Sequence, residues 1–217
     1  MDIITTYAGF EMLLRWGHLL AGVTWIGLLY YFNFVQTEYF KEAEADAKSN
    51  AIRKLAPRAL WWFRWGAAVT LITGLLIILM RSFALSVDLY IGAILGLLMF
   101  LNVWMIIWPK QQIVIKSAET VANGGQTLPE AGDALASAGL ASRTNTLFSV
   151  PMLFFMGAST HYPHELGFLS FSLILVIIGA LEYNAIKGQL GPLTSVNGVI
   201  GCGFGLTVVL LAILELT

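Results

Sequence analysis

The chain has 217 residues, of which 58% are hydrophobic and only 12% are charged, half the charged fraction of an ordinary globular domain. Its net charge of −1 provides no basic surface for a nucleic acid partner. The single cysteine, Cys202, excludes an intramolecular disulfide, a CxxC metal site and a CxxCH haem attachment. The composition therefore predicts an integral membrane protein with a lipid bilayer as its main partner.

Six apolar segments approach the length of about 20 residues that a helix needs to cross a membrane. They cover residues 8–35, 59–80, 87–108, 144–159, 167–186 and 194–216, and the fourth is the shortest. No repeat or linker marks a second domain. We expect a single all-α transmembrane domain over residues 1–217, a bundle of about six helices.

Two long polar connections separate these segments. Residues 37–58 carry many charges and an apolar stripe, which predicts an amphipathic surface helix that ends near Pro57. Residues 110–143 are expected to continue the third helix to about residue 122 and to break at Asn123-Gly124-Gly125. The small-residue stretch 128–142 is predicted to be a loop or a frayed helix.

Lysine and arginine residues gather in the connections after the first, third and fifth segments, whereas the other two connections carry only Arg81. Basic residues near membrane helices favour the cytoplasmic side. The long loops are therefore predicted to be cytoplasmic, with both termini on the outer side.

His18 lies within the first apolar segment, about 15 Å from its outer end. An ionisable residue in hydrocarbon is costly and usually functional. Neutral imidazole is a common axial ligand of haem iron, so His18 is a candidate haem ligand. The alternative is a histidine that only hydrogen bonds to a neighbouring helix.

His161 and His164 follow the fourth segment and are expected on the same side of the membrane as His18. A His18–His161 pair is thus a candidate ligand set for haem b iron, and a His18–His164 pairing stays open. Histidines beside a proline turn at an interface are often simply solvated, and solvation is the favoured alternative for His164, next to Pro163.

Other polar and aromatic residues accompany these histidines. Arg15 is a candidate partner for a haem propionate, although pairing with Glu11 four residues earlier is an equal alternative. Trp25 is expected to line the haem pocket. Arg64 stands among tryptophans and favours a cation–π role. The remaining polar groups in or near the spans, Asn33, Asn102, Asn145 and Glu182, are expected to satisfy each other or to mark a polar cavity.

Several short motifs resemble the N-terminal membrane domain of the bacterial membrane-bound urate oxidase (urate hydroxylase) family. They are Arg15-Trp16-Gly17-His18 with Trp25-Ile26-Gly27, Trp62-Phe63-Arg64-Trp65 with Thr73-Gly74, Asn102 with Pro109-Lys110-Gln111, and Asn145 and Pro151 with His161-Tyr162-Pro163. The likeness extends from about residue 15 to residue 163. Its first element is also similar to the copper-resistance D-like proteins and the membrane protoporphyrinogen oxidases.

The resemblance implies a bacterial cytoplasmic membrane domain that feeds electrons from a substrate into the respiratory chain. Full-length urate oxidases add a cytochrome c domain, whereas this sequence has no CxxCH motif. A separate cytochrome c or a respiratory complex is therefore the expected redox partner.

Three functions follow from these patterns. The first is a cytochrome b-like electron-transfer subunit with haem b on His18 and His161. The second is a urate-hydroxylase-like oxidoreductase. The third is a cofactor-free accessory subunit of a larger membrane complex.

Overall fold

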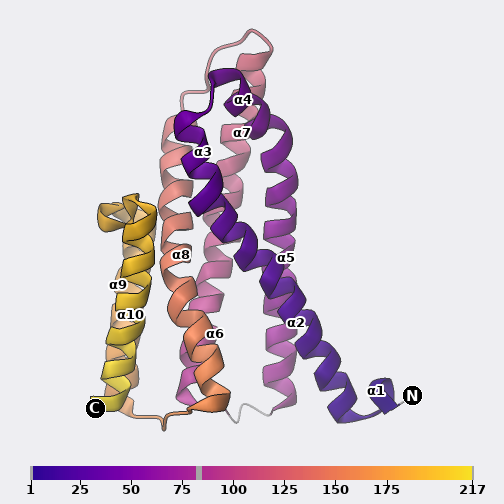
Figure 1. Cartoon of the computed structure of the whole chain (residues 1–217), viewed down its shortest axis with the longest axis vertical. Helices are drawn as coiled ribbons and strands as arrows, with labels where there is room; N and C mark the ends of the chain where they lie inside the picture. Colours follow the sequence, from indigo (N-terminus) through magenta and orange to yellow (C-terminus); the bar gives the residue numbers. More distant parts are fainter. Residues whose placement is uncertain (1, 82–84, 217) are drawn as a thin grey trace.

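The computed structural model describes residues 2–81 and 85–216, and every regular element in this part of the chain is helical (Figure 1). The α-helices are α1 (Asp2–Thr5), α2 (Tyr7–Tyr30), α3 (Thr37–Glu42), α4 (Ala45–Asn50), α5 (Ala56–Met80), α6 (Val87–Leu101), α7 (Trp108–Ala122), α8 (Ala131–His161), α9 (Phe168–Lys187) and α10 (Val196–Leu216). Three π-helical segments, η1 (Tyr31–Gln36), η2 (Ala51–Leu55) and η3 (Asn102–Ile107), and the 3₁₀ helix η4 (Gly191–Thr194) connect some of them.

Five helical rods are long and apolar enough to cross a membrane: Tyr7–Glu42, Ala45–Met80, Val87–Ala122, Phe168–Lys187 and Val196–Leu216. Helix α8 runs beside them as a sixth rod (Figure 1). The prediction of an all-α membrane bundle is confirmed. Both marked termini lie at one end of the bundle, which we call the terminal end, and the long connections lie at the opposite, loop end.

The rods differ in length, and this difference defines the depth of the membrane. Helices α9 and α10 have 20 and 21 residues, which corresponds to about 30 Å, the thickness of a hydrocarbon core. The three longest rods have 36 residues each and reach about 54 Å. They extend beyond α9 and α10 at the loop end (Figure 1). The loop end of the long rods is therefore expected to extend beyond a hydrocarbon core of this thickness.

One expectation about the connections is wrong. Residues 128–142 are not a loop, because α8 begins at Ala131 and continues to His161 without a break. Its first turns bury Ala134, Ala138 and Ala141, small side chains that allow close packing with neighbouring helices. The first connection is helical, as expected, except for a short break after Glu42. The predicted end of the third rod at Asn123 is confirmed, and Gly124 there has φ +85°.

Two prolines within these rods come just after a π-helical segment, whereas Pro151 lies inside α8 without one. Pro57 follows η2 and Pro109 follows η3, and in both cases the helix continues, so the expected boundary at Pro57 is wrong. A proline has no N–H and its ring clashes with the carbonyl four residues earlier. A wider π turn at that carbonyl relieves the clash, which accounts for the position of both segments.

Helix α8 occupies the centre of the bundle. It contacts α6, α7, α9, α10 and the end of α2. The seven consecutive residues from Arg143 to Ser149 are all buried. A helix enclosed by protein on every side can carry polar residues at membrane depth, which is why α8 lacks the apolar signal of the other five.

The expected cation–π role of Arg64 is confirmed. Its guanidinium lies 3.8 Å from the ring centroid of Trp108, 5.0 Å from that of Trp104 and 5.7 Å from that of Trp65. These three indoles come from α5, η3 and α7. They join two rods, Ala45–Met80 and Val87–Ala122, toward the loop end, and tryptophans normally gather at membrane boundaries.

Candidate functional site

His18 lies on the side of α2 that packs against α5. Its Nδ1 is 3.1 Å from Thr73 Oγ1. The Thr73 hydroxyl is itself 2.6 Å from the Val69 carbonyl oxygen, which can only accept, so its proton points there. His18 Nδ1 is therefore the donor to Thr73, and Nε2 carries the lone pair.

This arrangement is what a metal-binding imidazole needs. Ligand histidines normally donate their second N–H to a nearby oxygen, which fixes the tautomer and the ring orientation. Thr73 plays that part for His18. With Nδ1 as the donor to Thr73, Nε2 of His18 is the nitrogen that retains a lone pair.

Gly74 provides the space for the His18 ring. A Cβ at Gly74 would lie 3.1 Å from Cε1 and 3.5 Å from Nδ1 of His18. Even an alanine at this position would require the imidazole to shift by a few tenths of an ångström. The Thr73-Gly74 pair therefore positions His18, a role that the sequence motif suggested only through its family resemblance.

Arg15 lies one turn from His18 toward the terminal end and is bound to Glu11. Its Nη2 is 2.7 Å from Glu11 Oε1, and Nε is 3.1 Å from the same oxygen. Arg81 at the end of α5 donates to this oxygen at 3.2 Å. Two guanidinium groups share one carboxylate, so the cluster has one excess positive charge for an anionic group such as a propionate.

Trp25 lies two turns from His18 toward the loop end, on the same face of α2. It is 2% exposed and packs at the point where Gly66 of α5 approaches the α2 backbone. Its Nε1 is buried and has no hydrogen-bond partner among the described residues. A buried indole N–H without an acceptor is uncommon, so Trp25 Nε1 is an unused hydrogen-bond donor in this region.

His161 is the last residue of α8 and is exposed. His18 lies eleven residues inside α2, about 16 Å from the start of that helix. Within the described part of the chain, no hydrogen bond or ring contact joins the two histidines. The structure thus places both toward the terminal end, with His18 fixed to α5 and His161 at the helix terminus.

His164 has a different environment because both of its ring nitrogens face carboxylates. Nδ1 is 2.8 Å from Asp88 Oδ1 and Nε2 is 3.0 Å from Glu215 Oε1, and the backbone N–H of His164 donates to Asp88 Oδ2. Burial lowers the pKa of His164, but the hydrogen bonds and charges of Glu215 and Asp88 outweigh it, so the pKa lies above its ordinary value. A protonated imidazole has no lone pair for iron, which favours His161 over His164 as a partner for His18.

The His164 cluster is a residue set that the sequence reasoning missed. Asp88 is fully buried at the start of α6, and Glu215 ends α10. The cluster joins α6, the α8–α9 connection and α10 at the terminal end. The sequence signal that could have indicated this cluster is Asp88, an acidic residue at the very start of an apolar segment.

A second polar group lies deep between the rods. Asn102 Nδ2 donates to Asn145 Oδ1 at 3.0 Å and to Glu182 Oε2 at 3.1 Å. Asn145 Nδ2 donates to the Met99 carbonyl at 2.9 Å. The expectation that these residues satisfy each other is confirmed for this trio. Asn33 instead donates to Ser142 Oγ at 2.8 Å.

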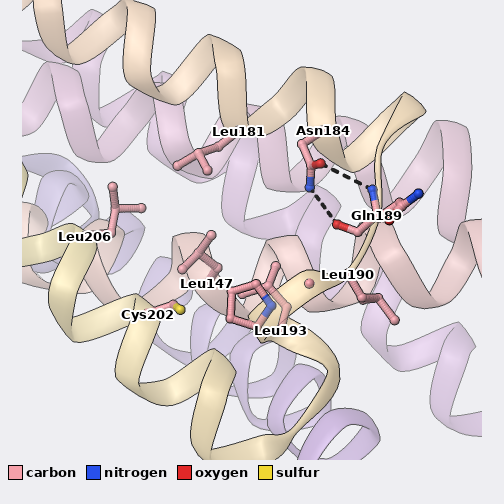
Figure 2. Close-up of a pocket in the computed structure, with 10 residues that line it drawn as sticks. Leu147, Leu181, Asn184, Gln189, Leu190, Leu193, Cys202 and Leu206 are labelled. Carbon is pink, nitrogen blue, oxygen red and sulfur yellow. Dashed lines mark hydrogen bonds between the residues drawn. The ribbon is translucent and has the colours of Figure 1, made fainter.

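A pocket of about 380 Å³ lies between α8, α9 and α10 near the loop-side end of α9 (Figure 2). Leucine side chains and Cys202 line most of it. Asn184 closes one side through two hydrogen bonds with the backbone of Gln189. None of the predicted site residues lines this pocket, so it is separate from the His18 region.

Fold and sequence together define a multi-pass helical membrane protein. Residues 83–187 match the family model described as "Urate oxidase N-terminal". The resemblance to the urate oxidase membrane domain is thereby confirmed over this stretch, which contains the His161-Tyr162-Pro163 motif. No curated protein and no solved structure matched the chain.

Proposed function

We propose that this chain is a membrane cytochrome b-like electron-transfer subunit that holds haem b through His18. The observation that carries the proposal is the fixed state of the His18 ring. Thr73 Oγ1 accepts a hydrogen bond from Nδ1–H of His18, and Gly74 leaves space for the ring. Nε2 therefore retains a lone pair at membrane depth. A histidine that only joins two helices would make the same hydrogen bond to Thr73, so absorption spectra are the measurement that separates the two roles.

The surrounding residues fit the same cofactor. The Arg15–Glu11–Arg81 cluster has one excess positive charge one turn away, which suits a carboxylate of the porphyrin. Trp25 contributes an apolar wall and a donor without a partner. We propose that His161 would be the second residue to hold the haem iron, because His164 is held by two carboxylates.

Bound haem supplies a one-electron Fe(III)/Fe(II) couple, and the protein sets its potential through ligands and burial. His18 would hold the iron, Arg15 would neutralise a propionate, and the surrounding helices would exclude water. The basic residues at the loop end support a cytoplasmic placement of that end in a bacterial inner membrane. The electron acceptor would then be a cytochrome c or a respiratory complex at the outer face.

Absorption spectra of the detergent-purified protein test the proposal. The reduced wild type should show sharp α and β bands, the His18→Ala variant should lose haem, and the His161→Ala variant should become high-spin. His164→Ala is the matched control and should keep the wild-type spectrum. A folded wild type without a Soret band, or a His18→Ala variant with an unchanged spectrum, would contradict the haem assignment.

The family match supports a second candidate, a urate-hydroxylase-like oxidoreductase. In that case the substrate would bind near the same histidines and deliver electrons to the haem. Turnover of urate by the purified protein, with an artificial electron acceptor present, separates an enzyme from an electron carrier. A haem that is reduced by an added donor but never by urate would favour the carrier.

A further inference from the structure

Glu182 is a carboxylic acid inside the membrane layer. It lies on α9, five residues before the helix ends at Lys187, so it is about 7.5 Å from the loop-side end of that helix. Its hydrogen-bond partner is Asn102, which also donates to Asn145, and Asn145 lies at a similar depth. Asn145 is 16 residues, or about 24 Å, from the terminal end of α8, and Glu182 is 14 residues, or about 21 Å, from the start of α9.

The orientation of the amides is fixed by a backbone carbonyl. The Met99 carbonyl can only accept, so the group of Asn145 that faces it must be Nδ2. Asn145 Oδ1 then faces Asn102, and Asn102 must present its Nδ2. Both protons of that nitrogen are used, one toward Asn145 and one toward Glu182 Oε2.

This orientation excludes a metal cation as the ligand of the trio. A cation such as Na⁺ or Ca²⁺ needs oxygen atoms, whereas Asn102 presents N–H groups to the carboxylate. In the described part of the chain, no group of three or more acidic, histidine or cysteine side chains has the spacing of a metal site. The chemistry of the site is that of a carboxylate with one N–H donor.

Among the described residues, no cationic side chain forms an ion pair with Glu182. The elements packed against α9 are η3, α6, α8 and α10. Their ionisable residues are Asp88, Tyr90, Asp133, Arg143, His161, Cys202 and Glu215, and α9 itself adds Tyr183 and Lys187. An ionised carboxylate that lacks a cation partner is expensive at membrane depth, and the neutral acid removes most of that cost.

We infer that Glu182 is a proton-binding site of the bundle, which takes up a proton from the loop end and releases it there. The Asn102 N–H stabilises the carboxylate after release, and the nearby loop-side boundary gives the proton a short route. Asn102 is also the first residue of the π-helical segment η3, a type of distortion that is frequent at functional sites. The inference goes beyond the proposed haem function and does not depend on it.

Infrared difference spectra of the protein in lipid, recorded between about pH 5 and about pH 9, test this inference. A protonated carboxyl in an apolar environment gives a C=O band at higher frequency than one in water. The wild type should show this high-frequency band, and Glu182→Gln should lose it. Glu165→Gln, which changes an exposed carboxylate, is the matched control and should retain the band.

The variant Asn102→Leu removes the donor and should keep the band present at a higher pH than in the wild type. If wild type and Glu182→Gln give the same spectra, the inference is overturned.

A second measurement needs no variant. N,N′-Dicyclohexylcarbodiimide reacts with protonated carboxyl groups in apolar surroundings, and mass spectrometry locates the adduct. At neutral pH the Glu182 peptide should be modified severalfold more than the Glu165 peptide. Equal or weaker modification of Glu182 would contradict the inference whether or not haem is present.

Discussion

Thr73 and Gly74 act on His18 as a unit, since one residue orients the ring and the other makes room for it. The hydroxyl fixes which nitrogen carries the proton, and the missing side chain allows the ring to reach the hydroxyl. The histidine alone would have neither property. The haem proposal therefore depends on residues of α5 as much as on His18.

Thr73→Val should weaken haem binding while the fold persists. Outer-shell partners of metal-binding histidines commonly contribute about 10–100-fold in metal affinity, and valine keeps the shape of threonine without the acceptor. Haem occupancy, measured by the Soret absorbance per protein, checks this. Thr70→Val is the control, because the Thr70 hydroxyl donates to Gly66 of its own helix and should leave occupancy unchanged.

Gly74→Ala should destabilise the α2–α5 contact by about 1–3 kcal/mol, because overpacking forces neighbouring side chains out of position. The new Cβ would lie 3.1 Å from His18 Cε1. Thermal unfolding in detergent measures the change. Gly22→Ala is the comparison, since a Cβ there meets nothing within 4 Å, and an equal loss in both variants would count against a specific role for Gly74.

At the scale of elements, α2 follows α5 closely and contacts α8 mainly near its loop end. Two hydrogen bonds cross from α2 and η1 to α8 there. Tyr30 Oη is 2.9 Å from Ser149 Oγ, and Asn33 Nδ2 is 2.8 Å from Ser142 Oγ. The pair α2–α5 is therefore joined to the central helix through few polar contacts.

A double-mutant cycle between Asn33→Ala and Ser142→Ala should give a coupling free energy of about 0.6 kcal/mol, the average for interhelical hydrogen bonds in membranes. Unfolding in mixed micelles supplies the four free energies. A cycle between Tyr30→Phe and Ser142→Ala is the control. These residues do not contact each other directly, so a coupling near zero is expected.

The His164 cluster joins three elements at the terminal end, and its effect depends on pH. The pKa of His164 is raised above its ordinary value of 6.5 in the folded protein. Its contribution to stability is therefore complete below that value and is lost as the pH rises through the raised pKa. Between about pH 6 and about pH 9, the unfolding temperature of the wild type should fall further than that of His164→Ala.

His161→Ala serves as the control for this pH series, because His161 is exposed and has no carboxylate partner among the described residues. It should retain the pH dependence of the wild type. The same slope in wild type and His164→Ala would show that the cluster does not titrate in this range.

For the whole molecule, the positions of the termini and of the basic residues predict the orientation in the membrane. In a Cys202→Ala background, a cysteine at Gly132 should resist a membrane-impermeant maleimide added to intact cells, whereas a cysteine at Glu165 should react. Both positions are exposed, at the loop end and in the α8–α9 connection respectively. After the cells are opened both should react, and labelling of Gly132→Cys in intact cells would contradict the orientation.

Composition and hydropathy alone determine most of the architecture. The lengths of the apolar segments predict six rods, because hydrocarbon has a fixed thickness and every backbone polar group must be paired inside it. Asn123-Gly124-Gly125 likewise marks the end of the third rod from local chemistry alone. The extent of α8 could not be predicted this way, because its first turns depend on small residues packing against other helices.

The candidate site was also predictable from the sequence only in part. A histidine at position 18 in a membrane helix is visible in the sequence, since an ionisable residue in an apolar run stands out. The partners of each polar group depend on which helix faces which, and hydropathy contains no such information. Only the tertiary structure shows that Thr73 lies beside His18 and that Asn102 donates to Glu182. It likewise shows that the His164 ring contacts Asp88 and Glu215. These contacts could not be predicted because they connect residues 43 to 80 positions apart in the chain or link three rods at once.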